Sequence, residues 1–209
     1  MAVQSDYRYS LTVNGSSQFE VVRFVLKEHL STLFRLELDL ASFGAEPNFH
    51  YLIDQPATLT FWQGDEAVRS VNGIVTALNQ GETGFTRTRY HMVIEPSLCR
   101  AGLQTDLRIF QQQDSQKIIE TLLSKNQVSQ SQFHLQTPYW TREYCVQYRE
   151  TDLNFIQRLA AEEGSYYYFE HTNNSHILHF SNSTTLSEKK GNLVYNAMPA
   201  GQRPEAAVW

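Results

Sequence analysis

Alternating apolar and polar positions dominate the first hundred residues of the chain. In the stretch LFRLELDLAS, an apolar residue occupies every second position from Phe34 to Leu40, the period of a strand with one buried face. Similar extended runs lie at residues 6–13, 19–26, 57–62, 67–78 and 85–94. Residues that favour turns separate the runs, at 14–15, 63–65 and 80–84. Six short strands joined by hairpins predict a barrel or a sandwich rather than a parallel sheet with crossover helices.

The pattern changes after Pro96, where two segments show helical spacing. In DSQKIIETLLSK, Asp114 can cap the start of a helix. In ETDLNFIQRLAAEEG, Thr151 or Asp152 can cap the start, and Gly164 is placed to end the helix. Each segment carries one apolar stripe, formed by Ile118, Ile119, Leu122 and Leu123 in the first and by Leu153, Ile156, Leu159 and Ala160 in the second.

The segment SYYYFEHTNNSHILHFSN predicts a β-hairpin with its turn at residues 173–175. Because side chains alternate across a strand, the three consecutive tyrosines do not form one cluster. The expected faces are Tyr166, Tyr168 and Glu170 on one side, and Tyr167, Phe169 and His171 on the other. From residue 182 onward the chain is polar and irregular, which is typical of a linker or an arm.

Composition narrows the classes of function. At 209 residues the chain can bury a sizeable core, and its 41% hydrophobic content is that of a globular protein. A net charge of −5, without a cluster of Lys and Arg, argues against binding to nucleic acid or to an anionic membrane. The start of the chain lacks the features of a signal peptide, and no apolar run is long enough for a membrane anchor. The two cysteines, Cys99 and Cys145, are predicted to be reduced and packed.

The adjacent acids Glu162 and Glu163 are the first candidates for chemistry. A glycosidase needs two carboxylates about 5–9 Å apart across a cleft. Neighbours on a helix point about 100° apart, so each acid would need a distant partner such as Glu150 or Asp152. A carbohydrate-active enzyme using Glu162 or Glu163 is therefore one hypothesis. The alternative is a helix end that is solvated or ion-paired, with Arg158 as the local partner.

The histidines His171, His176 and His179 are the second candidates. The hairpin register places His176 and His179 on opposite faces of their strand, which separates two of the three potential metal ligands. Edge-strand histidines are the favoured interpretation. No catalytic, cofactor-binding or metal-binding residue is predicted, because HExxH, GxGxxG, GxxxxGK[ST] and GxSxG do not occur.

The aromatic and charged residues of this region also suit a subunit interface. Tyrosine and phenylalanine offer large contact areas, and charge pairs can set the register between neighbouring copies. Arg149, Arg158, Glu150 and Glu163 are the candidates for such pairs. A tyrosine-rich hairpin that packs on its own helix explains the same residues, and both interpretations remain open.

Two long segments, 97–123 and 144–171, closely resemble the VgrG family, the spike proteins of bacterial type VI secretion systems. The likeness covers essentially the whole chain, with the run RIFQ (108–111) as an additional anchor. The motif that carries it matches at Tyr148, Glu150, Thr151, Phe155, Arg158, Glu162, Gly164, Tyr167, Tyr168 and Phe169. The resemblance implies that these residues are structural or form an interface rather than an active site.

The resemblance also implies a fold, an α+β protein that is mostly β. The expected domains are a split, phage tail hub-like β-barrel at 1–95 and a smaller domain with two helices and a β-hairpin at 96–183. An irregular arm at 184–209 would lead to downstream domains. Family members are several times longer, so the chain is expected to be a portion of such a protein or a truncated gene product.

The implied function is mechanical. Such a protein resembles a phage tail hub fused to a spike: a homotrimeric ring that docks on the Hcp tube and helps to puncture target membranes and deliver effectors. The expected partners are the Hcp tube and effector or adaptor proteins bound through C-terminal parts, without a cofactor. The protein would be made in the bacterial cytoplasm and then secreted through the apparatus. The alternative is a tail hub of a phage or of a related contractile injection machine.

Overall fold

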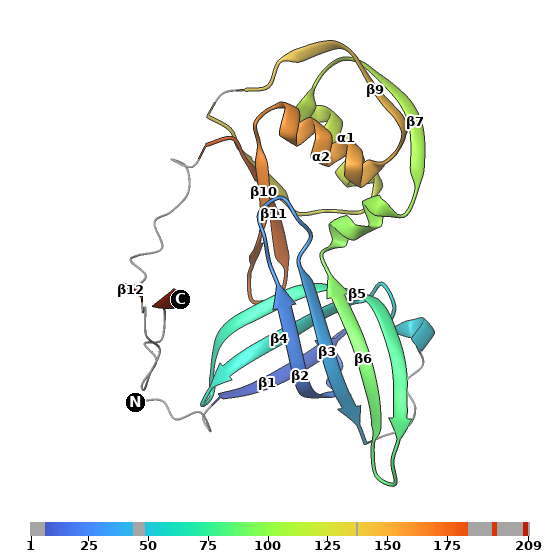
Figure 1. Ribbon diagram of the computed structural model, residues 1–209, viewed down its shortest axis with the longest axis vertical. Helices are drawn as coiled ribbons and strands as arrows, with labels where there is room; N and C mark the ends of the chain where they lie inside the picture. Colours follow the sequence, from blue (N-terminus) through green and yellow to red (C-terminus); the bar gives the residue numbers. More distant parts are fainter. Residues whose placement is uncertain (1–6, 44–48, 137, 184–193, 196–206, 209) are drawn as a thin grey trace.

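The computed structural model describes residues 7–43, 49–136, 138–183, 194–195 and 207–208. Its lower part in Figure 1 is a curled, six-stranded antiparallel sheet, with the strand order β1-β4-β5-β6-β3-β2. The strands are β1 (Tyr7–Val13), β2 (Glu20–Lys27), β3 (Arg35–Ser42), β4 (Pro56–Gln63), β5 (Glu66–Thr83) and β6 (Thr88–Glu95). A short 3-10 helix, η2 (Phe49–Tyr51), lies between β3 and β4. The six strands predicted from the alternating pattern are confirmed.

The inner face of this sheet forms the first hydrophobic core. On β3, Leu36, Leu38 and Leu40 are fully buried, as the alternation predicts. The predicted turn at 80–84 is displaced, because β5 continues to Thr83 and the turn is closed by a hydrogen bond from the Gly84 amide to the Arg87 carbonyl at 2.9 Å. The β5–β6 hairpin therefore reaches beyond the rest of the sheet, as the lower end of Figure 1 shows.

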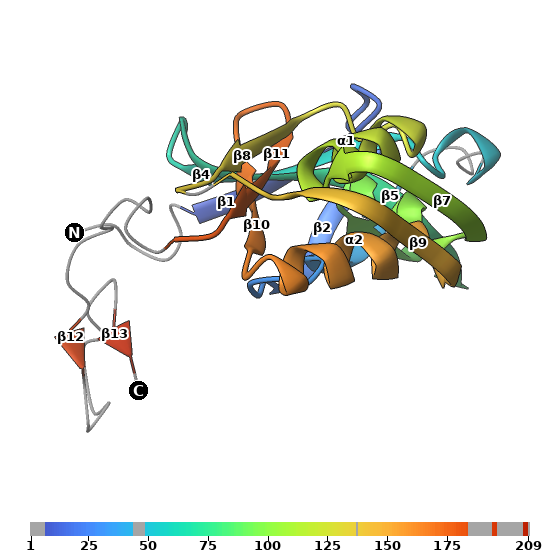
Figure 2. The same ribbon diagram turned by 90° about the horizontal axis from the view of Figure 1, so that it is seen from above.

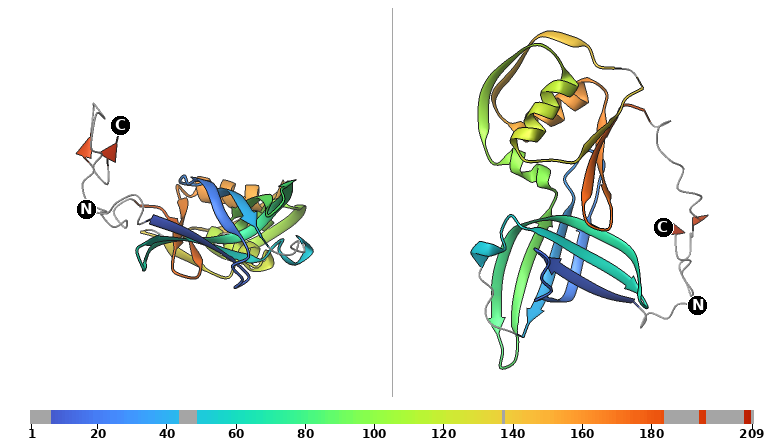
Figure 3. Two further views of the ribbon diagram at one scale, coloured as in Figure 1. Left: turned by 90° about the horizontal axis from the view of Figure 1, so that it is seen from below. Right: turned by 180° about the vertical axis from the view of Figure 1, so that it is seen from behind.

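The upper part combines two helices with shorter sheets. Figures 2 and 3 show the antiparallel β7–β9 ribbon arching around α1 and α2, while β10, β11 and β8 form a three-stranded sheet beside them. The strands β7, β8 and β9 are additions to the predicted elements. The elements are η3 (Ser97–Gly102), β7 (Thr105–Asp114), α1 (Ser115–Lys125), β8 (Ser131–His134), β9 (Thr141–Thr151), α2 (Asp152–Glu162), β10 (Tyr166–His171) and β11 (His176–Ser181).

Both helices begin at caps foreseen from the sequence. The Asp114 carboxylate accepts a hydrogen bond from the Lys117 amide at 2.8 Å, and the Thr151 hydroxyl accepts one from the Asn154 amide at 3.1 Å. Of the two predicted caps for α2, Thr151 is thus the one used. Gly164 follows α2 with φ of +66°, a left-handed conformation that suits glycine and ends the helix.

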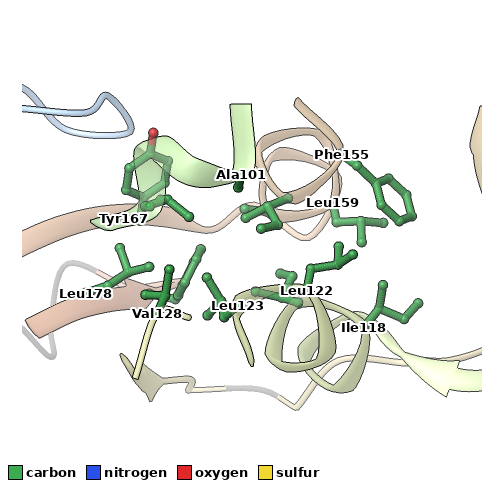
Figure 4. Close-up of a cluster of buried hydrophobic side chains, with 14 of the residues drawn as sticks. Ala101, Ile118, Leu122, Leu123, Val128, Phe155, Leu159, Tyr167 and Leu178 are labelled. Atoms are coloured by element: carbon green, nitrogen blue, oxygen red, sulfur yellow. The ribbon is translucent and has the colours of Figure 1, made fainter. Parts of the chain in front are cut away.

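The second core lies between the helices and the three-stranded sheet. Figure 4 shows Ile118 and Leu122 of α1 facing Phe155 and Leu159 of α2, with Tyr167 of β10 at the other end of the cluster. Both predicted stripes are buried, except that Leu153 is only partly covered. The further members of this core are Leu98, Ala101, Phe110, Ile119, Leu123, Val128, Cys145, Ile156, Ala160, Leu178 and Phe180.

The predicted domain boundaries at residues 95 and 183 stay a prediction. Of the predicted arm at 184–209, most lies outside the described residues. Its described parts are β12 (Val194–Tyr195) and β13 (Ala207–Val208), which pair with each other in parallel. Within the described ranges, no helix has the length and apolar content needed to cross a membrane.

Candidate functional site

The two acids at the end of α2 are held by a single arginine from β9. Arg142 donates from Nη1 to Glu162 Oε2 at 2.7 Å, and from Nη2 to Glu163 Oε1 at 2.7 Å. The Ser115 hydroxyl, at the start of α1, donates to the same Glu163 oxygen at 2.6 Å. The expectation that the two carboxylates point apart needs a correction, because both reach one guanidinium whose fork spans the gap between them.

Arg158 forms the other half of this charge network. Its guanidinium donates to Glu150 at 2.6 Å and to Glu162 at 2.9 Å, so the predicted pairing of Arg158 with Glu162 is confirmed. It also donates to the Val146 carbonyl at 3.0 Å and lies 5.0 Å from the ring centre of Phe155. The hydrogen bond with Glu150 is the main cause that raises the pKa of Arg158 well above its usual range. One arginine thus ties α2 to β9.

The ionisation of Glu162 does not suit a catalytic acid. Burial of the carboxyl opposes ionisation, but hydrogen bonds from Arg142 and Arg158 outweigh it and hold the pKa of Glu162 below its usual range. A general acid in a glycosidase needs the opposite, a carboxyl whose pKa is raised. The neighbouring Glu163 is engaged by Arg142 and Ser115. These acids brace the end of a helix, and their geometry offers no acid/base pair.

A cavity lies away from the acids at the end of α2. It is a groove of about 410 Å³ between the curled sheet and the helical part, and its lining includes Asp54, Cys99, Arg100 and Lys125 but not the acids of α2. Its two cations are already paired: Arg100 donates to Asp54 at 2.8 Å, and Lys125 lies 3.0 Å from Asp152. The groove therefore has no free charge with which to select a ligand.

A buried acid that the sequence suggested as a cap, or as a distant partner for Glu162 or Glu163, sits at the start of α2. Asp152 is 2% exposed and accepts hydrogen bonds from Gln147 and Asn126, both at 2.8 Å. Its nearest cation is Lys125, with Arg108 farther away at 3.7 Å. The bonds fasten α2 to the ends of α1 and β9. Nothing in the sequence marks this site, because its partners are 5 to 44 positions away along the chain.

Two of the histidines singled out in the sequence fasten the hairpin to other segments, His171 to the curled sheet and His176 to η3. His171 accepts a hydrogen bond at Nδ1 from the Asn72 amide at 3.1 Å, and His176 accepts one at Nε2 from the Ser97 amide at 3.2 Å. The ring of Phe34 on the barrel side packs edge-on against both imidazoles. Burial, followed by the charges of His171 and Arg100, lowers the pKa of His176 to about 4. His176 must be neutral to accept the hydrogen bond from the Ser97 amide, because both nitrogens of a charged imidazole are donors.

The third histidine lies on the opposite face, as predicted. His179 stacks on Tyr168 with ring centres 4.9 Å apart, and its Nδ1 lies 2.8 Å from Nε2 of His134. The interpretation of His176 and His179 as edge-strand residues is wrong, because β8 pairs in parallel with β11 and makes β11 the central strand. Among the described residues, no group of three or more His, Cys, Asp or Glu could hold a metal ion.

The motif residues occupy several distinct positions. Glu150, Arg158 and Glu162 converge in the charge network, whereas Tyr148 is 64% exposed on the outer face of β9. The tyrosines of the hairpin alternate between faces as predicted, with Tyr167 buried. The remaining motif positions are Thr151 as the cap, Gly164 after the helix, Phe155 in the core, and Tyr168 and Phe169 on β10.

The two cysteines are free, as predicted. Cys145 is buried on β9 and belongs to the second core. Burial raises the pKa of Cys99 to about 11, so this thiol is not poised to react as a thiolate. Cys145 therefore acts as a packing group, whereas Cys99 is a part-buried thiol in the lining of the groove.

Comparison with known proteins places these features in one family. The model of the phage tail baseplate hub (GPD) family matches residues 27–208. The spike protein VgrG2a of the type VI secretion system of Pseudomonas aeruginosa is 38% identical over 208 residues, which is 98% of this chain and 25% of that protein. The spike protein VgrG3 of Vibrio cholerae is 40% identical over 170 residues, which is 81% of this chain and 17% of that protein.

The fold has a solved counterpart as well. The E. coli c3393 protein, described as a type VI secretion component with structural similarity to the T4 bacteriophage tail proteins gp27 and gp5, superposes with a TM-score of 0.80. The alignment covers 90% of this chain and 52% of that one at 23% identity, and shows a shared fold. The chain spans about a quarter or less of the length of these curated relatives. It belongs to the phage tail baseplate hub (GPD) family and is homologous to the VgrG spike proteins of type VI secretion systems.

Proposed function

We propose that the chain is the hub portion of a type VI secretion spike, and that three copies form a ring that docks on the Hcp tube. The observation that carries this proposal is the match to the hub family over residues 27–208, joined to 38% identity with a spike protein along nearly the whole chain. In this role the chain transmits force and catalyses no reaction.

The internal architecture supports a role in transmitting force. Six hydrogen-bonded strands form the curled sheet, and the hairpin β10–β11 is fastened to it through Asn72 and His171, while His176 fastens the hairpin to Ser97 of η3. The charge network engages the acids at the end of α2 in intramolecular pairs with Arg142 and Arg158. Such pairs resist displacement of the helix when the ring is compressed along the tube axis by the contracting sheath.

In this proposal the remaining parts of a full-length spike carry the other functions. The spike helps to puncture the target membrane and delivers effectors, which are bound directly or through adaptors outside the hub portion. The protein is made in the bacterial cytoplasm and leaves through the secretion apparatus. A tail hub of a phage or another contractile injection machine is the second candidate, favoured by the description of the matched family as a phage tail baseplate hub.

Docking on a tube end can be tested by sedimentation. Hcp from the same bacterium is assembled into tubes, and one half of the preparation is sheared into shorter pieces with the same total mass. We expect the chain to pellet with the tubes, and the bound amount to rise in proportion to the number of ends. Binding that follows tube mass, or no binding at all, contradicts the proposal. Binding to a phage tail-tube protein but not to Hcp favours the second candidate.

A further inference from the structure

The outer face of the β7–β9 ribbon carries an apolar stripe. Four large side chains point outward and are more than half exposed: Leu107 at 56%, Ile109 at 57%, Tyr144 at 56% and Tyr148 at 64%. The strand register brings them together, because Leu107 lies opposite Tyr148, and Ile109 lies opposite Val146. We call Leu107, Ile109, Tyr144, Val146 and Tyr148 together the ribbon stripe. Cross-strand neighbours of this kind form one continuous surface.

The inner face of the same ribbon is already used. Phe110 and Cys145, which lie opposite each other, are buried in the second core, and Gln147 is fully buried with its amide bonded to Asp152. Figures 2 and 3 show the ribbon curving over the helices with its outer side facing away from them. The ribbon stripe is therefore surplus to the folding of this part of the chain.

The rim of the stripe carries a cation without an ionic partner. Arg149 follows Tyr148 with φ of +52°, and its guanidinium lies over the Tyr148 ring at 5.5 Å. It forms no ion pair with any residue in the described ranges. Tyrosine and arginine around an uncharged centre are the composition of protein interfaces, where both residue types are enriched.

The area of the stripe fits one side of a stable interface. An aromatic side chain can bury about 150–250 Å², so the two tyrosines, each more than half exposed, leave roughly 240 Å² uncovered. With Leu107 and Ile109 the apolar area reaches about 400 Å², the size of patch that marks an interaction site. One side of a standard interface buries about 800 Å², of which somewhat more than half is apolar.

We propose that the ribbon stripe is the surface through which one copy of this chain meets the next copy in the ring. The identity of the partner rests on the proposed function. A second copy can supply a local charge pair, because its 22 Asp and Glu residues offer surface carboxylates to Arg149. A ring with threefold symmetry pairs unlike patches, so the stripe meets a different surface of its neighbour.

The test compares the solution mass of variants across a concentration series. Ile109→Glu and Tyr148→Glu each place a carboxylate in the stripe at an exposed position, where it does not disturb the core. Thr121→Glu is the matched control, because it adds the same charge at an exposed position of α1 in the same part of the molecule. Circular dichroism melting confirms that all three variants fold. Light scattering after size exclusion then gives the mass of each.

We expect the unmodified chain and Thr121→Glu to approach three times 24.1 kDa at high concentration. Ile109→Glu and Tyr148→Glu should remain monomers, or should form trimers only at concentrations at least tenfold higher than the unmodified chain requires. Folded stripe variants that trimerise like the control overturn the assignment of this surface. An unmodified chain that stays monomeric at every concentration overturns the contact between copies.

A photo-crosslinking phenylalanine derivative at position 148 identifies the partner directly. A covalent product near twice 24.1 kDa supports the second copy, whereas a product with a different protein overturns it. Sedimentation with Hcp tubes separates the two proposals. If the chain binds tube ends but the stripe variants have the same solution mass as the unmodified chain, the proposed hub function is supported. Only the assignment of the ribbon stripe as the contact between copies is then contradicted.

Discussion

At the scale of single residues, Arg142 shows what helical periodicity cannot reveal. The i, i+4 pair of Arg158 and Glu162 follows from the sequence, because both residues lie on one helix. Arg142 lies on β9, 20 positions before Glu162, and reaches both acids only because the ribbon folds back over α2. Glu162 and Glu163, which were candidates for a catalytic role, are thus ion-pair partners that stabilise the fold. Their contact with Arg142 could not be predicted because the residues are far apart in the sequence.

Removing Arg142 should cost stability. Glu163 is 13% exposed in its side chain, so Arg142→Met leaves a largely buried carboxylate without its cation and should destabilise the chain by about 1–3 kcal/mol. Arg142→Lys should recover only part of this, since an ammonium cannot bridge two carboxylates with a fixed fork. Urea unfolding measures both variants. Arg87→Met, at an exposed turn residue, is the control, and equal midpoints for Arg142→Met and the control would refute the role of the network.

The core contact of α2 gives a second prediction at this scale. Leu159 is 0% exposed and faces α1, so Leu159→Ala should lower the free energy of unfolding by about 2–5 kcal/mol. Asn154→Ala, on the exposed side of the same helix, should change it by less than about 0.5 kcal/mol. Chemical denaturation measures both, and a midpoint that is insensitive to Leu159→Ala contradicts the packing described.

At the scale of elements, the barrel strands and both helices were predictable, because each buries one face and shows it as a regular period. The β7–β9 ribbon was not predictable. Its inner face contains the polar residues Arg108 and Gln147 at positions where a strand with one buried face usually has apolar residues. Strand β8 has four residues, too few to display a period. Its parallel pairing with β11 is a long-range contact, which is why His179 was expected at an edge and lies in the middle of a sheet.

The attachment of the hairpin to η3 should depend on pH through His176. Its folded pKa of about 4 lies below the usual value of 6.5, so the unfolded chain takes up the proton first as the pH falls. The contribution of His176 to the free energy of unfolding is therefore fully present above pH 6.5. About 3 kcal/mol of it is lost as the pH falls towards 4.

The variant His176→Gln isolates this contribution. A glutamine oxygen can accept the hydrogen bond from the Ser97 amide but does not titrate, so the loss of stability between pH 7 and pH 4.5 should be smaller than in the unmodified chain. Urea unfolding at the two pH values measures the difference. If both proteins lose the same free energy, His176 is not the group responsible.

At the scale of the whole molecule, the two cores are joined through Asn72 of β5. Its side-chain amide donates to the carbonyls of Thr172 at 2.7 Å and Ser175 at 3.0 Å, at the turn of the hairpin. The turn itself was predicted from its residues, but its contact with a barrel strand 100 positions earlier was not. The family resemblance supplied the overall architecture, whereas local patterns supplied only its parts.

Loss of this contact should loosen the joint between the two parts. Asn72 is 3% exposed, and Asn72→Ala removes the donor to the Thr172 carbonyl and one of the donors to the Ser175 carbonyl, which still accepts from the Thr172 amide; the change should cost about 1–3 kcal/mol. Hydrogen exchange should accelerate at the Asn72 amide, which donates to His171, more than at the amides of β3. Equal protection at both places in the variant would show that the joint does not depend on this side chain.

The hub role is tested most directly by electron cryo-microscopy of the chain mixed with short Hcp tubes. We predict density with threefold symmetry that caps tube ends, into which three copies of the described fold can be placed with their curled sheets continuing the tube wall. Tube ends that stay bare at saturating concentrations of the chain, or copies bound along the side of the tube, would contradict the proposed function.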